Sequence, residues 1–344
     1  MTTYKEAGVD VDYGDRCSRL AYQAAQGTFP SRKGMIGEPV SDEGGFTGML
    51  DMGDYYIVQN DDGVGTKIEV AVLMNKFDTL GYDLVAMVAD DGVCVGAEII
   101  SVSNTLDANK LDEAMVRGLM AGLQKAASEQ KIVVPGGELA ELGDMLNGPV
   151  WNATAVGIVE KDKVITGDTI RAGDVIIGLK SRGIRSNGLT LARRILRDNF
   201  GQDWVHQDYG DGRTWGEVIL TPSKIYHRAL LSILGGYKEK RTLTIKGLAH
   251  NTGGGIRGKL PRLLKKRGFG AELTDLIQPH EFMLKLMKTG NVPRDEAYRT
   301  WNMGIGMMLI SAPDDAGAIL DALKKQGVEG QVMGKVVKGE EIKF

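Results

Sequence analysis

Acidic side chains beside glycines are the residues in this sequence that could do chemistry. Asp61 and Asp62 open the segment Asp61–Lys67, which follows a strand-like run at Tyr56–Gln59. Two glycines in this segment let backbone amides approach an oxyanion, Lys67 offers a positive charge to a phosphate, and adjacent carboxylates suit a hard cation such as Mg²⁺. The segment predicts a phosphate and metal site, with an acidic hairpin turn as the alternative.

Further acidic residues follow predicted helix and strand ends. Asp90 and Asp91 come after the helix-like run Leu84–Ala89, and Glu138 comes after two glycines and the strand-like run Ile132–Val134. Two carboxylates at the C-terminal end of a helix repel each other and the helix dipole unless a cation neutralises them. These acids are therefore candidate cation ligands, and a solvated turn is the alternative at the end of the helix.

A glycine turn in the second half of the chain has the pattern of an anion site. Ser186, Asn187 and Gly188 lie between a strand-like run, Val175–Leu179, and a helical pattern, Leu189–Asn199. Free amides and the helix dipole favour an anion at such a helix N-terminus. The alternative is that Ser186 or Asn187 only caps the helix.

His250 stands beside Asn251, Thr252 and three consecutive glycines. The chain has four histidines, and the ordinary pKa of this side chain suits proton transfer near neutral pH. A buried structural histidine is the alternative. Gly253–Gly258 also fits a dinucleotide-binding spacing, but these glycines do not directly follow a strand and Pro261 falls early in the next helix, which disfavours that site.

The elements that must position these residues alternate between strand and helix patterns. This alternation predicts an α+β fold with two domains of the α/β type. Because residues 160–173 are polar and rich in turn residues, we place the boundary between domains 1–165 and 166–344. The predicted strands are Tyr56–Gln59, Ile132–Val134, Ala153–Val159, Val175–Leu179, Leu243–Ile245 and Gly306–Ile310, and the predicted helices are Thr79–Val88, Leu111–Gln130, Leu189–Asn199, Pro222–Leu234, Lys259–Lys266 and Asp315–Gln326.

Composition excludes several classes of protein. The 344 residues have a formal net charge of -3, 42% are apolar and 25% charged, which is typical of a globular protein and argues against nucleic acid as a partner held by bulk charge. Neither Cys17 nor Cys94 forms a CxxC pair, and the sequence shows no signal peptide or membrane span, so we expect a cytoplasmic protein. The basic run 236–267, with ten Lys or Arg and one Glu, is either solvated surface or a phosphate-binding region.

Four segments in order resemble the phosphoribosylformylglycinamidine cyclo-ligase family, also called aminoimidazole ribonucleotide synthetases. They are the opening Tyr4–Asp10, the loop Asp62–Lys67, the loop His250–Gly255 and the stretch Tyr298–Met307. The resemblance covers nearly the whole chain. It implies an ATP-dependent closure of the imidazole ring of formylglycinamidine ribonucleotide in purine synthesis, in a homodimer whose N-terminal-domain strands close a shared barrel.

The same resemblance implies roles for the candidate residues, with ATP and Mg²⁺ as cofactors. His250 would act in acid/base catalysis, and Lys67 would act on the ATP phosphates. The implied metal ligands are Asp62, Asp91 and Glu138; the implied ATP-binding residues are Gly44, Gly45, Gly63, Val64, Gly65, Thr66 and Lys67; the implied substrate-binding residues are Ser186, Asn187, Gly188, Thr252 and Gly253.

Five positions depart from the pattern of this family. They are Asp61 for the usual Thr, Asp90 for Asn, Ile99 for Pro, Leu139 for Thr and Arg185 for His. Because of these departures, the alternative function is that of a divergent relative with the same fold that phosphorylates another small substrate, as thiamine-monophosphate kinase does. A nucleotide-binding pseudoenzyme would lose carboxylates, whereas this chain has a surplus of them.

Overall fold

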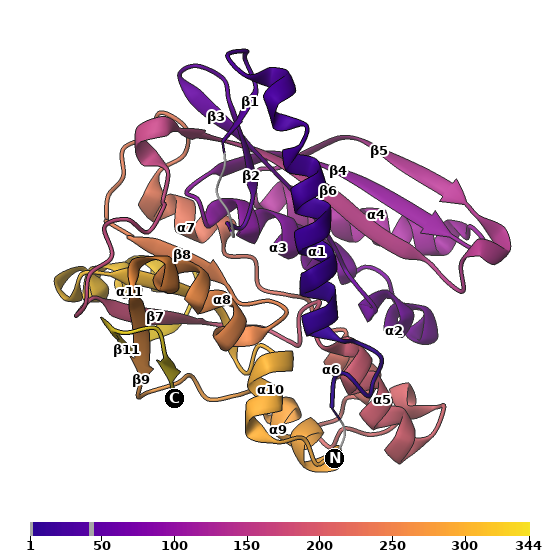
Figure 1. Ribbon diagram of the computed structural model, residues 1–344. Helices are drawn as coiled ribbons and strands as arrows, with labels where there is room; N and C mark the ends of the chain where they lie inside the picture. The colour runs from indigo at the N-terminus through magenta and orange to yellow at the C-terminus, as the bar shows by residue number, and fades with distance from the viewer. Residues whose placement is uncertain (1–2, 41–44) are drawn as a thin grey trace.

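Two mixed sheets organise the molecule (Figure 1). The computed structural model describes residues 3–40 and 45–344, and within them each sheet has six strands. All neighbours in the first sheet are antiparallel except β4 and β5, which are parallel. Its strands, in spatial order, are β1 (Glu38–Val40), β2 (Gly48–Asp51), β3 (Tyr55–Gly63), β6 (Val150–Glu160), β4 (Glu98–Ala108) and β5 (Val133–Glu141).

The second sheet is built from the C-terminal half of the chain. Its strands, in spatial order, are β12 (Ile342–Lys343), β9 (Phe269–Leu273), β11 (Gly330–Lys338), β7 (Val175–Lys180), β10 (Ile305–Ser311) and β8 (Gly247–His250). The predicted two-domain α+β class is therefore confirmed. The strands of the described residues each belong to one sheet, and residues 161–174 connect the two sheets.

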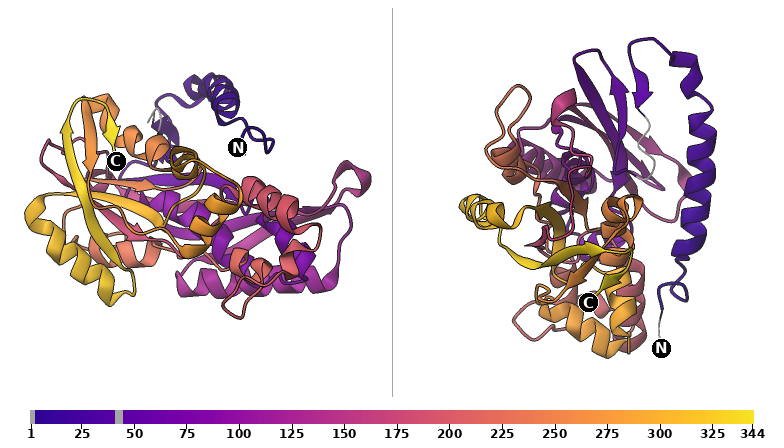
Figure 2. Two further views of the ribbon diagram at one scale, coloured as in Figure 1. Left: turned by 90° about the horizontal axis from the view of Figure 1, so that it is seen from below. Right: turned by 60° about the vertical axis from the view of Figure 1, so that its left-hand side comes forward.

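Helices cover both sheets and fill the space between them (Figures 1 and 2). They are α1 (Val11–Gln26), α2 (Lys67–Met74), α3 (Leu80–Val93), α4 (Glu113–Glu129), α5 (Leu189–Phe200), α6 (Trp215–Ile219), α7 (His227–Leu234), α8 (Gly255–Leu264), α9 (Glu281–Thr289), α10 (Arg294–Thr300) and α11 (Ala316–Lys325). Short 3₁₀ turns lie at Phe29–Arg32, Gly143–Met145, Lys161–Lys163, Trp204–His206, Lys265–Arg267 and Pro313–Asp315. Among the helices of the described residues, none has the length and apolar character needed to cross a membrane.

The central helix α3 links the two halves of the molecule. It packs against β3, β6 and β4 of the first sheet and also against α4, α7 and β8. Its sequence is apolar on every side, with Leu84, Val85 and Val88 fully buried, as expected for a helix surrounded by protein. The helix continues past the predicted end at Val88, so Asp90 and Asp91 belong to its last turns and reach the second domain.

Two predicted strands are placed differently in the structure. The prediction of a strand at Leu243–Ile245 is wrong, because β8 begins at Gly247, where its ladder with β10 ends at the Ile310–Gly247 pair. The predicted strand at Ile132–Val134 is too short, since β5 runs through Pro135 and two glycines to Glu141. β5 is the edge of its sheet, and an edge strand tolerates proline because one side needs no ladder partner.

The N-terminal helix α1 stands apart from both sheets (Figure 2). Residues 13–25 of this helix are exposed, and Asp10 caps its N-terminus by accepting from the amide of Tyr13. The preceding turn is held on the body of the molecule, where the Tyr4 amide donates to the Glu296 carboxylate at 2.8 Å. An amphipathic helix with so little contact gains its order mainly from its two attached ends.

Candidate active site

Three of the predicted segments meet where the two sheets approach each other. A Cβ atom at Gly65, in the loop after β3, would lie 3.1 Å from the carbonyl oxygen of Ser186. A Cβ atom at Gly253 would lie 3.3 Å from Oδ1 of Asn187. The loop after β3, the turn before α5 and the triple-glycine loop before α8 therefore touch one another. Gly65 has a φ of +54°, which favours glycine at this point of contact.

Two desolvated carboxylates face this junction. Burial, together with the nearby charge of Asp91, raises the pKa of Asp62 to about 6. Burial likewise raises the pKa of Asp91 to about 7, against the lowering effect of Lys259, Arg262 and Arg185. Only 18% of the Asp91 side chain is exposed. Desolvated acids that repel each other favour a cation between them.

Lys259 is a charged residue of this junction that the sequence did not single out. It lies one helical turn after Gly255 on α8, and burial lowers its pKa while the charges of Asp91 and Asp62 raise it. Within the described part of the chain, its ammonium group has no hydrogen bond or ion pair. The spacing in the sequence could have indicated this residue. Side chains on a helix tilt toward its N-terminus, so a lysine four residues after the helix begins points toward the glycine loop that precedes the helix.

His250 is completely buried at the end of β8, with both ring nitrogens engaged. Nδ1 lies 2.7 Å from Oδ1 of Asp91, and Nε2 lies 2.6 Å from Nη2 of Arg185. Burial, and then the charge of Arg185, lower the pKa of His250 well below its ordinary value. The expectation that His250 passes a proton to the substrate does not fit this geometry, because neither nitrogen is free. The ring instead holds the Asp91 carboxylate.

Lys67 is also placed differently from the expectation. Its ammonium group is fully buried and donates at 2.8 Å to both oxygens of Asp83 and to the carbonyl oxygen of Thr221. Three partners use all three of its donors, so no donor remains for an ATP phosphate. Lys67 joins α2 to α3 and to the loop before α7. The sequence could have indicated this role of Lys67, because Asp83 lies within the apolar run of α3 and a buried acid there needs a cationic partner.

Glu138 lies away from the other two predicted metal ligands. Asp62 on β3 pairs with Ala153 on β6, which pairs with Asn104 on β4, which in turn pairs with Gly137 on β5. Three strand spacings, about 14 Å, therefore separate β5 from β3. Glu138 is exposed on this outer strand. In residues 3–40 and 45–344, no group of three or more His, Cys, Asp or Glu side chains is placed to hold a metal ion. A single chain therefore brings together Asp62 and Asp91 without Glu138.

The predicted substrate residues lie in the turn before α5 and in the loop before α8. The hydroxyl of Ser186 is buried and has no hydrogen-bond partner among the described residues. Gly188 is the N-cap of α5 with a φ of +74°, and any side chain there would collide with Trp301. Thr252 is buried, whereas Gly253 is exposed. An unpaired buried hydroxyl at a helix N-terminus is the arrangement expected of an anion contact.

The glycine-rich N-terminal segment approaches the junction from its basic side. Gly45 and Phe46 line a small cavity together with Arg262, whose guanidinium group lies 5.4 Å from the Phe46 ring centre. Lys266 and Arg267 border the same cavity, so part of the basic run faces this segment. Gly44, the other residue expected to cover a nucleotide, lies outside the described residues. Val64 and Thr66 continue the loop, with Val64 buried and Thr66 3.4 Å from the Thr190 hydroxyl.

Three of the residues that depart from the family pattern, Arg185, Asp90 and Ile99, have specific buried partners in the structure. Nη2 of Arg185 lies 3.1 Å from Oδ2 of Asp90, so two departures form one buried ion pair. The amide of Ile99, where the resembled family has a proline without an N–H, donates to Nε2 of His227 at 2.9 Å. These departures are therefore matched within the structure.

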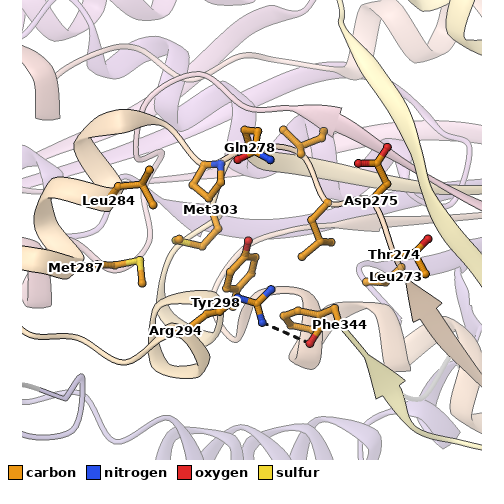
Figure 3. Close-up of a pocket in the computed structure, with 13 residues that line it drawn as sticks. Leu273, Thr274, Asp275, Gln278, Leu284, Met287, Arg294, Tyr298, Met303 and Phe344 are labelled. Atoms are coloured by element: carbon orange, nitrogen blue, oxygen red, sulfur yellow. Dashed lines mark hydrogen bonds between the residues drawn. The ribbon is translucent and has the colours of Figure 1, made fainter.

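A larger cavity, of 480 Å³, lies elsewhere in the second domain (Figure 3). It is enclosed by the segment after β9 together with α9, α10 and Phe344, and Arg294 and Tyr298 project into it. None of the predicted site residues that the structure describes lines it. The chemistry predicted from the sequence is therefore located at the junction and not in this cavity.

The two sheets and the charged junction between them define a two-domain α+β enzyme with a composite site. The chain belongs to the AIR synthase related proteins: residues 44–159 match the family described as the N-terminal domain of these proteins, and residues 171–344 match the C-terminal domain.

Whole-length relatives have a common name. The chain is 40% identical over 337 residues to a phosphoribosylformylglycinamidine cyclo-ligase of Thermococcus kodakarensis, covering 98% of this chain and 96% of the relative. It is 38% identical over 348 residues to the protein of that name from Methanocaldococcus jannaschii, covering 99% and 94%. Among solved structures, the T. maritima PurL complex with FGAR superposes with a TM-score of 0.60 at 17% identity, covering 87% of this chain and 45% of that one. AaThiL with AMPPCP and TMP also gives 0.60, at 14% identity and with 87% and 86% covered.

Proposed function

We propose that this protein is an ATP-dependent cyclo-ligase that closes the imidazole ring of formylglycinamidine ribonucleotide to give aminoimidazole ribonucleotide. The single observation that carries the proposal is the whole-length identity of about 40% to relatives named phosphoribosylformylglycinamidine cyclo-ligase. The reaction would begin with transfer of the γ-phosphoryl group of ATP to the formyl amide oxygen. An amidine nitrogen would then attack the activated carbon, and phosphate would leave with that oxygen.

The junction offers parts that such phosphoryl transfer needs. Transfer of this kind relies on positioning and on charge stabilisation. Lys259 and Arg262, which flank Asp62 and Asp91, can supply the positive charge that the sequence assigned to Lys67. The amides of Gly65 and Thr66 and the unpaired Ser186 hydroxyl can meet phosphate oxygens, whereas the Gly63 and Val64 amides already donate to Asp62 and to the Trp151 carbonyl oxygen. With His250 occupied, a water molecule or one of the carboxylates is left to accept the proton of the amidine nitrogen.

Asp62 and Asp91 fit a Mg²⁺ ion that arrives with ATP. Mg²⁺ is usually held by one or two carboxylates together with phosphate oxygens and water, so two acids suffice. Burial raises the pKa of both carboxyl groups, and a bound cation would offset this cost of burying their charged forms. When bound, the ion would neutralise charge on the transferred phosphoryl group. Asp62 and Asp91 would hold it, and His250 would orient Asp91.

A homodimer is part of the proposal. β5 is an edge strand of nine residues whose outer side has no ladder partner in the described chain, and Val133, Val134 and Leu139 on it are 62%, 39% and 45% exposed. Such an edge favours pairing with a second copy. Pairing of β5 with a second copy would join the first-domain sheets of the two chains into a shared barrel. The domain limits 1–165 and 166–344 and the cytoplasmic location stay predictions.

The experiment that tests the proposal is substrate-dependent release of ADP. Purified protein with ATP and Mg²⁺ is offered formylglycinamidine ribonucleotide or thiamine monophosphate, and ADP and the product are measured. The proposal expects ADP and aminoimidazole ribonucleotide in equal amounts with the first substrate only. ADP formed with thiamine monophosphate alone would identify a kinase, and ATP binding without turnover of either substrate would identify a nucleotide-binding pseudoenzyme.

A further inference from the structure

A continuous chain of buried hydrogen bonds ends at the Asp91 carboxylate. We call it the Arg185 relay, and its members are Asp91, His250, Arg185, Asp90 and His227. His250 joins Asp91 to Arg185 through contacts of 2.7 and 2.6 Å, and Arg185 joins Asp90 at 3.1 Å. The other Asp90 oxygen accepts from the backbone amide of His227 at 3.0 Å. The relay therefore connects the first domain, through α3, with β8 and α7.

The chemistry of arginine fixes the direction of every hydrogen bond in the relay. A guanidinium group has only donors, so Nε2 of His250 must accept from Arg185. The ring proton must then reside on Nδ1, which donates to Oδ1 of Asp91. This arrangement leaves the other oxygen of Asp91 without a partner in the relay, and that oxygen can face a ligand in the junction.

The structure holds Arg185 in this position at some energetic cost. Its φ is +65°, a region that few residues other than glycine adopt, and its Nε is buried without a partner in the described structure. It is anchored by a 2.9 Å hydrogen bond from Nη1 to the Lys224 carbonyl oxygen and by the Tyr226 ring, 5.4 Å away. Backbone strain of this kind persists where the surrounding contacts determine it, and it is common at functional sites.

We propose that Arg185 is a positioning residue: it orients the His250 ring, and through that ring it aims the Asp91 carboxylate at the cation in the junction. The consequence for the cation rests on the proposed function, in which Asp91 is a metal ligand. The orientation of His250 does not rest on it. Asp90 completes the unit because it balances the charge of Arg185 and fixes its Nη2 group.

The test combines a histidine spectrum with metal binding by the whole protein. Long-range ¹H–¹⁵N spectra of the four histidines, assigned with His250→Asn, report which ring nitrogen carries the proton. Titration with Mn²⁺ measures the cation affinity without turnover. The main variant is Arg185→Lys, because an ammonium group keeps the charge beside Asp90 but cannot reach Asp90, His250 and Lys224 together. The matched control is Arg182→Lys on the same loop, since Arg182 donates to the carbonyl oxygens of Pro222 and Ser223 and contacts neither His250 nor Asp90.

The expected wild-type spectrum has His250 protonated on Nδ1 only, with this proton in slow exchange. Arg185→Lys should abolish the slow exchange and weaken Mn²⁺ binding by about 10-fold to 100-fold, the usual effect of losing a residue that orients a metal ligand. Arg182→Lys should change neither result. A proton on Nε2 in the wild type, or an Arg185→Lys protein with unchanged exchange and Mn²⁺ affinity within about twofold, overturns the proposal.

Two further results separate folding and metal binding from positioning. If Arg185→Lys does not fold, the double variant Asp90→Asn with Arg185→Met removes both buried charges, and the same losses are expected from it. If Asp91→Asn leaves Mn²⁺ affinity unchanged while Arg185→Lys still abolishes the slow exchange of His250, the orienting action of Arg185 is supported and the proposed metal role of Asp91 fails.

Discussion

Lys67 illustrates how a residue in a phosphate-loop pattern can serve the fold. Breaking its buried pair with Asp83 by Lys67→Met should cost about 3–5 kcal/mol of unfolding free energy, because the buried Asp83 carboxylate then loses its cationic partner and keeps only the hydrogen bond from the Ser223 hydroxyl. The double variant Lys67→Met with Asp83→Leu should recover most of this loss. Urea unfolding measures both. If the folded double variant binds ATP at least about tenfold more weakly than the wild type, Lys67 contacts the nucleotide after all.

Asp62 and Asp91 should decide the affinity for Mg²⁺-ATP. Asp62→Asn or Asp91→Asn should weaken binding by about tenfold or more, because each removes one of the two charges that hold the cation. The control is Asp61→Asn: successive residues of a strand point to opposite faces, and Asp61 accepts from the Thr154 hydroxyl on the other face of the sheet. Calorimetry with Mg²⁺-ATP compares the three variants. Equal affinity in Asp61→Asn and Asp91→Asn would remove the metal assignment.

At the scale of elements, hydrophobic periodicity predicted the helices that are buried on all sides or on one face. The amphipathic pattern of α5 appears in the structure close to its predicted bounds, and the largely apolar α3 begins near its predicted start but continues past its predicted end at Val88 to Val93. β8 was misplaced because the length of its partner β10 sets its start, and no local pattern contains that information. The contacts of His250 were equally hidden, since Arg185 and Asp91 lie 65 and 159 positions away in sequence. Local sequence indicates which side chains have a reactive group, whereas long-range packing decides which of these groups have no partner in the protein and can contact a substrate.

The contact between α7 and β4 predicts a pH dependence of stability. Burial lowers the pKa of His227 to about 3, and its neutral Nε2 accepts from the Ile99 amide. Between about pH 6.5 and 3 the unfolded chain binds a proton that the folded protein excludes. This contribution to stability is therefore complete above pH 6.5 and falls by about 1.4 kcal/mol for each pH unit below it.

Chemical unfolding of wild type and His227→Gln from pH 7 to 4.5 checks this prediction. Glutamine keeps an acceptor for the Ile99 amide but does not titrate in this range. The wild type should lose stability relative to the variant as the pH falls. Parallel curves for the two proteins would show that His227 is protonated equally in the folded and unfolded states.

The whole molecule depends on contacts that cross between its two halves. α3 belongs to the first domain, yet its last turn carries Asp90 to the amides of α7 and Asp91 to His250 on β8. Lys67 similarly ties α2 to the loop before α7. The site is therefore assembled only when both domains are folded and docked. The edge of the first sheet, in contrast, faces away from these contacts and has no partner within the described chain.

This free edge makes the last prediction one of assembly. Light scattering at micromolar concentration should give the mass of a homodimer, because β5 presents unpaired backbone groups beside Val134 and Leu139. Val134→Lys with Leu139→Lys should produce a monomer, since charges on an edge strand oppose pairing. The melting temperature should change little beyond what dissociation itself causes, as both side chains are exposed in the single chain. Met145→Lys, at a residue 80% exposed outside β5, is the control and should remain dimeric. A wild-type protein that is monomeric under these conditions would contradict the proposed dimer and with it the shared barrel.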